Sequence, residues 1–589
     1  MARTGILRLV ALVSATVWLP LMASAQSVQI KDVGFQGYFS PSDPLRVRVH
    51  VANPSHAPLS FDLRFQALTG ESSEQTDSVL YQVKLLAGQE REFDIPLPLA
   101  RYGNFTLQME ASAGGRSVGK EARSLTLQNN LVAILCPNPD VCHQAQDSIV
   151  LSGTQEEQAG KSKSYIFLTS GSLFDEWWAY SGIHAIVLAR PVSDLSAAQQ
   201  TALEGYVREG GQLVLIDSLL AKAPFLERYR RASLGKPYSE LGVGRLYHVA
   251  DLGVGLATLF NRSVSEWSGD QSLQDFRSYP RYYRGYDAVL NQIRPRLATT
   301  FVFPRLQTLL CWLGVYILIV GICNFAILRY LDRREWGWVT TPVIALFFSA
   351  GLYFISTANR PKQLHLDEVA VYTMDEASPM AVMQAGVRVS SPRRDQVSVV
   401  LPEGPLWNDA SNALSADSME RGLPIHHNFS LHQGWEVQIA PEQRYSLPLL
   451  QWSFKDLEFK DIKMFPGTVR RLDDDHLINE TGRSFQDAIY WTNAKLYLLG
   501  AVSAGASIDL RSVAQEPFPG MKTYDWKFMQ QQKSKPFTLR ELIWNASSAP
   551  ETETFYGLAD EPILGAQLAD RQFERRHLSV TVVSMVDNP

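Results

Sequence analysis

The sequence lacks an excess of positive charge, internal repeats and low-complexity tracts. Its net charge at pH 7 is −5, and no basic stripe runs along any part of the chain. Because proteins that bind nucleic acid neutralise phosphates with clustered lysine and arginine, we expect no nucleic-acid partner. The missing repeats and tracts argue against a solenoid and against disorder on a large scale. At 589 residues the chain is too long for one core, and three or four folded units are expected.

Charge is absent from two long apolar runs, residues 306–328 and 336–359. Each run is long enough to cross a bilayer core, which takes about 20 helical residues, and we expect two transmembrane helices. Neither run contains an ionisable side chain that would mark a conduction path, which argues against a transport function. Asn324 is polar within the first run and is expected to hydrogen-bond either a partner helix or its own hairpin.

The first 25 residues have the three parts of a signal peptide. Arg3 and Arg8 form a basic region, an apolar stretch follows, and Ala23-Ser24-Ala25 supplies the small residues of a cleavage site. The pattern predicts a mature chain that begins at Gln26, with an uncleaved anchor as the alternative. Either alternative exports the chain that follows.

Export fixes the expected topology by parity. The first span runs toward the cytoplasm and the second returns from it, so residues 329–335 form a cytoplasmic turn. The parts of the chain before the first span and after the second both lie on the exported side of the membrane. Arg329, Arg333 and Arg334 in this turn agree with the excess of positive charge found on the cytoplasmic side.

Hydrophobic periodicity divides the rest of the chain. Residues 26–129 alternate between apolar and polar side chains in short segments, which predicts an antiparallel sandwich of immunoglobulin-like type. Residues 130–305 contain short apolar strands separated by helical stretches, the pattern of a parallel α/β sheet. Within it, Ser196 and Gln199 predict a capping box at a helix start. Two β-rich domains, 360–470 and 471–589, are expected after the second span.

Cysteine is scarce, with four residues in the whole chain. Cys136 and Cys142 lie six residues apart in an exported segment, which favours a small disulfide loop. A thiol nucleophile at Cys136 is the alternative, although no glycine elbow surrounds it. Cys311 and Cys323 lie in the first span and are expected to pack as apolar residues.

Three short motifs suggest chemistry that their surroundings do not support. GGRSVGKE at 114–121 is close to a phosphate-binding loop and to a hydrolase elbow, but it lies between two predicted strands, so Gly114-Gly115 is predicted to be a hairpin turn. The run 473–476 and the pair His426-His427 lack the spacing of calcium or zinc ligands. We therefore expect no metal, no cofactor and no catalytic constellation.

Three stretches carry a resemblance that spans nearly the whole chain: HAIVLARPVSDLSAAQQTALEGYVREGGQLVLID, YILIVGICNFAILRYLDRREWGWVTTPVIALFF and SFQDAIYWTNAKLYLLGAVSAGASIDL. The chain resembles a group of bacterial inner-membrane proteins with a signal peptide, an immunoglobulin-like domain, a domain similar to class I glutamine amidotransferases, a transmembrane hairpin and an exported β-rich tail. The G-x-C-x-G elbow and the H-x-E pair of the amidotransferases are absent here, so the resemblance implies a non-catalytic relative.

The resemblance also implies partners and a location. Such proteins often look like parts of envelope systems that are encoded with von Willebrand A-type proteins and MoxR-type ATPases. The expected protein is therefore a two-pass inner-membrane protein whose periplasmic domains bind protein or glycan partners within a larger assembly. An envelope hydrolase or transferase and an accessory subunit of a transporter are the alternatives.

Overall fold

The computed structural model is rich in β-strands and has few helices. It describes residues 27–39, 44–68, 78–97, 104–128, 131–150, 164–168, 173–220, 238–242, 244–253, 306–358, 363–401, 406–408, 436–439, 443–451, 453–492, 495–517, 539, 553–569 and 572–585. The predicted signal peptide and the His426-His427 pair lie outside these residues.

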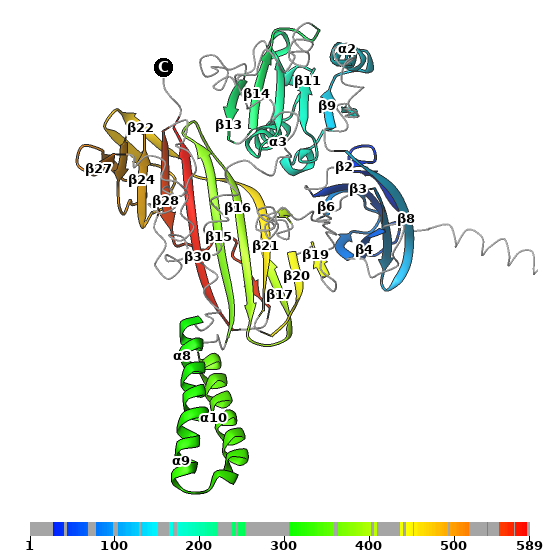
Figure 1. The fold of residues 1–589 in the computed structure, drawn as a ribbon. Coiled ribbons are helices and arrows are strands. Elements are labelled where there is room, and N and C mark those ends of the chain that lie inside the picture. Colours follow the sequence, from blue (N-terminus) through cyan, green and yellow to red (C-terminus); the bar gives the residue numbers. More distant parts are fainter. Residues whose placement is uncertain are drawn as a thin grey trace, which may run out of the picture.

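The N-terminal part folds as two facing sheets, drawn in blue in Figure 1. One sheet consists of β1 (Ser27–Val33), β3 (Leu45–Ala52) and β6 (Glu90–Leu97). The other begins with β2 (Tyr38–Phe39), β8 (Arg116–Leu127), β7 (Phe105–Ala113), β4 (Leu59–Leu68) and β5 (Ser78–Leu85). Alternate residues of β3 and β4, such as Val49 and Leu63, are fully buried between the sheets, which explains the period of two in the sequence.

The hairpin predicted at Gly114-Gly115 is confirmed. β7 ends at Ala113 and β8 begins at Arg116, and these two residues are paired. Both glycines have positive φ, 55° and 78°, which a two-residue turn of the type that matches strand twist requires. The motif is therefore a turn between two strands and not a phosphate-binding loop.

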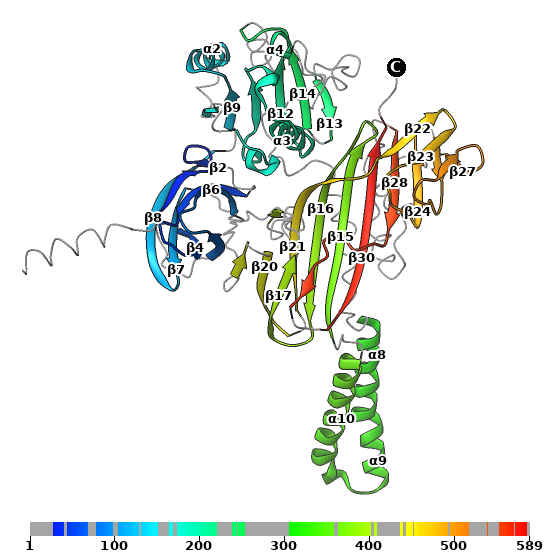
Figure 2. The same cartoon turned by 180° about the vertical axis from the view of Figure 1, so that it is seen from behind.

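The second sheet of the sandwich does not end at β5. Strand β19 (Glu436–Gln438) pairs with β5 in parallel, with Val437 beside Val79, although more than 350 residues separate them in the sequence. The sheet then continues through β20 (Gln443–Leu449), β17 (Asp395–Leu401) and β29 (Gln567–Leu568). The N-terminal sandwich and the C-terminal part of the chain thus share one nine-stranded sheet and one buried cluster (Figure 2).

A second nine-stranded sheet, here called the long sheet, contains the longest strands. In order its strands are β18 (Leu406–Asn408), β21 (Ser453–Met464), β16 (Ser378–Ser391), β15 (Leu364–Asp375), β30 (Phe573–Ser584), β28 (Thr554–Ala559), β24 (Asp487–Trp491), β25 (Lys495–Leu498) and β27 (Ala514–Pro517). β15 and β30 run parallel at its centre. Residue 470, the expected divide between two domains, therefore does not separate two independent sheets.

Two details complete the C-terminal part. The apolar segment 447–454 is divided between two strands, because β20 ends at Leu449 and β21 begins at Ser453. A small third sheet consists of β22 (Val469–Asp473), β23 (His476–Asn479) and β26 (Ser507–Asp509).

Residues 131–253 contain a six-stranded sheet, referred to below as the parallel sheet. Its order is β10 (Ser164–Leu168), β9 (Leu131–Leu135), β11 (Ala185–Leu188), β12 (Gln212–Ile216), β14 (Gly244–Val249) and β13 (Tyr238–Leu241), and β13 alone of these is antiparallel to its neighbour. Among its described residues, the helices of this unit are α2 (Pro139–Val150), α3 (Ala197–Arg208), α4 (Asp217–Leu220) and two 3₁₀ turns, η4 (Trp177–Tyr180) and η5 (Val192–Asp194). The predicted capping box at Ser196 and Gln199 is present.

Two apolar helices form a hairpin that extends from one end of the long sheet (Figure 1). The first consists of α8 (Leu306–Ile317), a π-helical segment (Leu318–Cys323) and α9 (Asn324–Tyr330), and a 3₁₀ turn, η9 (Arg334–Trp336), leads into α10 (Gly337–Ala358). Two 21-residue segments, Leu310–Tyr330 and Arg334–Phe354, are long and apolar enough to cross a membrane. The side chain of Asn324 lies 3.4 Å from Thr341 Oγ1, so its hydrogen bond is within the hairpin.

Candidate functional site

The carboxyl ends of the parallel strands place four chemically active residues at one edge of the sheet. Cys136 follows β9, Arg190 lies two residues beyond β11, Asp217 follows β12 directly, and His248 lies near the end of β14. In an open α/β sheet, ligands bind outside this edge. We call these residues the carboxyl-edge site.

The direction of winding reverses between β9 and β11, within this edge. Ala145 of α2, the helix that follows β9, packs on one face of the sheet. Leu203 of α3, the helix that follows β11, packs on the other face. Two helices that leave adjacent strands toward opposite faces leave a gap between their connecting loops, and this topological switch point is the usual place for a ligand.

His248 and Asp217 form a pair on neighbouring strands. His248 Nδ1 lies 3.2 Å from Asp217 Oδ1, and His248 is in register with Leu215 of β12. His248 Nε2 is buried and has no hydrogen-bond partner among the described residues. A carboxylate that orients an imidazole in this way leaves the other ring nitrogen available to a ligand or a substrate.

The structure joins Cys136 and Cys142 in a disulfide, with their Cα atoms 5.5 Å apart. Both residues are buried in the cluster that contains Ala145 and Val187. His248 lies in one row with Leu188 and Leu215, which belong to the cluster on the opposite face. Cys136 therefore carries no free thiol, and His248 lies on the other face of the sheet.

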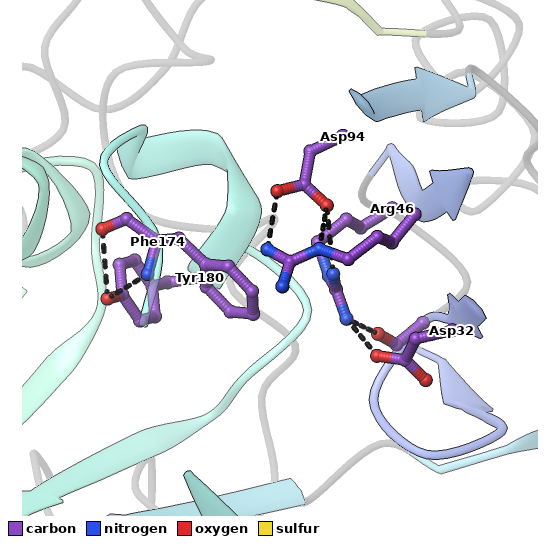
Figure 3. A network of polar contacts seen from close by, with 7 residues as sticks. Asp32, Arg46, Asp94, Phe174 and Tyr180 are labelled. Atoms are coloured by element: carbon purple, nitrogen blue, oxygen red, sulfur yellow. Dashed lines mark hydrogen bonds and ion pairs between the residues drawn. The ribbon is translucent and has the colours of Figure 1, made fainter. Parts of the chain in front are cut away.

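A second polar cluster joins the sandwich to the parallel-sheet unit (Figure 3). Arg46 of β3 is buried; its guanidinium donates to Asp94 Oδ1 at 3.0 Å and to the carbonyl of Gly34 at 2.9 Å, and it also pairs with Asp32. The same guanidinium lies over the ring of Phe174, with its carbon 4.4 Å from the ring centroid. The sandwich therefore meets the parallel-sheet unit through a cation on an aromatic face, a geometry that favours arginine.

The groups around Arg46 are satisfied by hydrogen bonds and charge. The Tyr180 hydroxyl accepts from the Phe174 backbone N–H at 3.0 Å and donates to its carbonyl at 3.1 Å, and burial raises the pKa of Tyr180. Burial alone would raise the pKa of Asp94, but the hydrogen bond from Arg48 and the charge of Arg46 outweigh it and hold the pKa below its ordinary value. The carboxylate of Asp94 is thus ionised at neutral pH.

The lowered pKa of Asp94 predicts a specific pH dependence. A carboxyl group with a depressed pKa in the folded state contributes stability above its unfolded pKa, about 4, and loses that contribution as the pH falls through the folded value. We expect Asp94→Asn to lower the melting temperature of the purified protein at pH 7 and to have a progressively smaller effect below about pH 4. A difference between the two proteins that stays constant from pH 7 to pH 3 would contradict this assignment.

The C-terminal end of α3 fixes the parallel-sheet unit to the long sheet. Arg208 is almost completely buried; it pairs with Asp375 of β15 and donates to Glu204 Oε1 at 2.9 and 3.0 Å. Next to it, Lys460 Nζ lies 2.7 Å from Glu209 Oε1. Gly205 faces the long sheet so closely that an added Cβ would lie 2.5 Å from the Ile462 side chain. Two ion pairs and a close packing contact therefore join these units.

The arginines predicted for the turn lie at the tip of the hairpin. Arg329 is in the last turn of α9, Arg333 precedes η9 and Arg334 begins it. The β-sheets lie at the opposite end of the hairpin (Figure 1, Figure 2). The structure does not bring these arginines near the carboxyl-edge site or the Arg46 cluster.

The run 473–476 forms the turn between β22 and β23. His476 Nδ1 lies 2.8 Å from Asp473 Oδ1, and both side chains are exposed. Within the part of the chain that the structure describes, no three His, Cys, Asp or Glu side chains gather as metal ligands would.

Sequence patterns did not single out Arg190, Asp217, His248 or Arg46. A signal for the first two was present, because each follows a short, mainly apolar strand, at the end where parallel strands present functional groups. His248 and Arg46 lie inside strands, where a polar residue ordinarily faces solvent. Their environment depends on units that are distant in the sequence.

Comparison with known proteins adds little. No protein-family model and no curated protein sequence matches the chain. A cycloisomaltooligosaccharide glucanotransferase from Paenibacillus sp. is 12% identical over 27% of this chain and 20% of its own, with a TM-score of 0.16. A superoxide reductase from Ignicoccus hospitalis is 15% identical over 18% of this chain and 83% of its own, with a TM-score of 0.14. A sporulation control protein from Bacillus subtilis is 11% identical over 21% of this chain and 54% of its own, with a TM-score of 0.12. The chain thus spans a fifth of the glucanotransferase, and likenesses this slight indicate no function.

Proposed function

We propose that this protein is a non-catalytic, membrane-anchored scaffold of the bacterial cell envelope, whose exported domains bind protein or glycan partners. One observation carries the proposal. Folded units that precede the hairpin in the sequence contact units that follow it, and these contacts lie at one end of the hairpin. The contacts are the β5–β19 pairing and that of Arg208, while Arg46 joins the two preceding units to each other. A hairpin that holds a joined, extended β-surface near one membrane suits an assembly platform, because sandwich edges and loops provide binding surface.

The assignment of the units follows the resemblance. The sandwich is proposed to be immunoglobulin-like, and the parallel sheet is proposed to be an amidotransferase-like domain without its active site. The disulfide that engages Cys136 supports a non-catalytic domain. Partners of the von Willebrand A type, served by a MoxR-type ATPase, are proposed on the same resemblance. The hairpin turn would be the cytoplasmic point of contact for such a system.

The sidedness is part of the proposal. The β-sheets lie at one end of the hairpin, and the turn with Arg329, Arg333 and Arg334 lies at the other end (Figure 1). Positive charge in a short turn favours the cytoplasm, which places the folded units in the periplasm.

Photo-crosslinking in native membranes tests the scaffold. A photoreactive residue is placed at Leu86 or Leu472, exposed positions in two different exported units, and at Leu331 in the hairpin turn as the control. We expect envelope proteins or glycans as adducts at the first two positions and a different, cytoplasmic set at Leu331. Cytoplasmic adducts at Leu86 would invert the topology, and an absence of adducts at both exported positions would contradict a scaffold.

The Asp217–His248 pair favours one alternative, an envelope hydrolase or transferase. Turnover of an amide or glycan by the purified protein, abolished by His248→Asn, would establish that alternative and overturn the scaffold. Alkylation adds a separate test of the thiol: Cys136 is expected to resist iodoacetamide until the disulfide is reduced. Labelling of the native, unreduced protein at Cys136 would restore the thiol nucleophile as a candidate.

A further inference from the structure

Arg190 is a buried arginine with few hydrogen-bond acceptors in the part of the chain that the structure describes. Its side chain is only 4% exposed, yet its Nε and Nη1 atoms have no hydrogen-bond partner among the described residues. Its one ion pair there joins Nη2 to Asp194 Oδ2 at 3.5 Å, beyond the usual length of an N–H···O hydrogen bond. The guanidinium therefore keeps most of its donors unused while it is removed from water.

Two other buried arginines show what the fold does when the role is structural. Arg46 has Asp94, Asp32 and a backbone carbonyl as acceptors, and Arg208 has Glu204 and Asp375. A buried charge without such partners is strongly unfavourable, and apolar residues of similar volume serve packing better. A guanidinium that is buried with one distant carboxylate, and with no acceptor for Nε and Nη1 among the described residues, is therefore suited to a ligand that supplies acceptors.

The position of Arg190 agrees with a ligand site. The residue lies at the carboxyl end of β11, at the switch point where α2 and α3 leave toward opposite faces. On the next two strands of the same edge are Asp217 and His248, and the buried Nε2 of His248 also has no partner within the described part of the chain. Asp194 and Asp217 are partly exposed, so the edge reaches solvent beside them.

We propose that the carboxyl edge of the parallel sheet binds a small oxyanion, a carboxylate or a phosphate group, on the guanidinium of Arg190. The planar fork of arginine donates two parallel hydrogen bonds to such a group. The anion takes the place of the Asp194 carboxylate, which lies 3.5 Å from Arg190 Nη2, and the rest of the ligand lies toward Asp217 and His248. The carboxyl-edge site thereby makes the parallel sheet a ligand-sensing unit, independent of whether the exported domains form a scaffold.

Isothermal titration of the full-length protein in detergent tests this site. The probes are sodium phosphate and sodium acetate, each against sodium chloride at equal ionic strength. We expect at least one probe to bind the wild type with heat that chloride does not produce, and Arg190→Met to raise the dissociation constant tenfold or more. Asp194→Asn removes the competing carboxylate and is expected to tighten binding.

Arg245→Met is the matched control, because Arg245 is a buried arginine at the amino end of β14, with its guanidinium over the Tyr238 ring. This variant is expected to bind the probe as the wild type does. Arg190→Lys keeps the positive charge but loses the planar fork, and its dissociation constant for the probe is expected to lie between those of the wild type and Arg190→Met. This variant also serves as the test if Arg190→Met does not fold. If only phosphate or only acetate binds, the result supports the site and shows whether its ligand is a phosphate or a carboxylate. The proposal is overturned if neither probe binds better than chloride, or if binding is equal in the wild type and both Arg190 variants.

Discussion

Arg208→Met is expected to loosen the parallel-sheet unit from the long sheet and to lower the free energy of unfolding by about 3–5 kcal/mol. The reason is the partner that remains: Asp375 would stay buried on β15 without the guanidinium that neutralises it. Glu204 would lose two hydrogen bonds as well, although it is closer to solvent. Urea unfolding of the full-length protein measures the loss, and hydrogen exchange of α3 shows where it occurs.

A double variant separates the ion pair from general damage at this position. Arg208→Met combined with Asp375→Leu removes both charges of the pair between the units and leaves only the more exposed Glu204 without the guanidinium, so it is expected to recover much of the loss. If the free energy of unfolding of Arg208→Met lies within about 0.5 kcal/mol of the wild-type value, the ion pair does not hold the two units together.

The second large effect is expected at Glu368 of β15, which is completely buried. Its carboxylate accepts backbone N–H groups from Ile563 at 3.1 Å, Ala566 at 3.2 Å and Leu564 at 3.4 Å. These residues belong to the connection that leaves β28 in the long sheet and enters β29 in the other nine-stranded sheet. Glu368 thus fixes the crossover between the two sheets.

Glu368→Ala removes the acceptor and leaves buried donors unpaired, each of which costs about 1–3 kcal/mol. We expect a loss of unfolding free energy of about 3 kcal/mol or more, measured by urea unfolding, with faster hydrogen exchange in residues 563–566. Glu368→Gln keeps one acceptor oxygen and the same shape, and it should lose clearly less. Equal losses in the two variants would mean that volume at this position, and not hydrogen bonding, decides the effect.

Prediction from the sequence was most successful where one element carries its own signal. The strands Leu131–Leu135 and Ser164–Leu168, the capping box at Ser196 and the turn at Gly114-Gly115 are all present where the patterns place them. Each depends on side chains within a few residues of one another. The two apolar helices have the same property, because length and missing charge are local quantities.

The candidate sites were less predictable because their chemistry depends on contacts between distant segments. Nothing near Arg46 in the sequence shows that Phe174 will cover its guanidinium, and nothing near Arg190 shows how few acceptors it will meet. Among the described residues, Arg46 has two carboxylates and a carbonyl as acceptors, whereas Arg190 has only Asp194, at 3.5 Å. That difference arises from the packing of whole units and has no local pattern.

By itself, therefore, the sequence determined the class of each segment: β-rich units, a parallel sheet with crossover helices, and two apolar helices. Only the tertiary structure decided which strands become neighbours. The pairing of β5 with β19, and of β15 with β30, brings together segments from opposite ends of the chain. The physical reason is that a period of two specifies which face of a strand is buried, whereas the partner strand is chosen by register and by the shape of a core assembled from the whole chain.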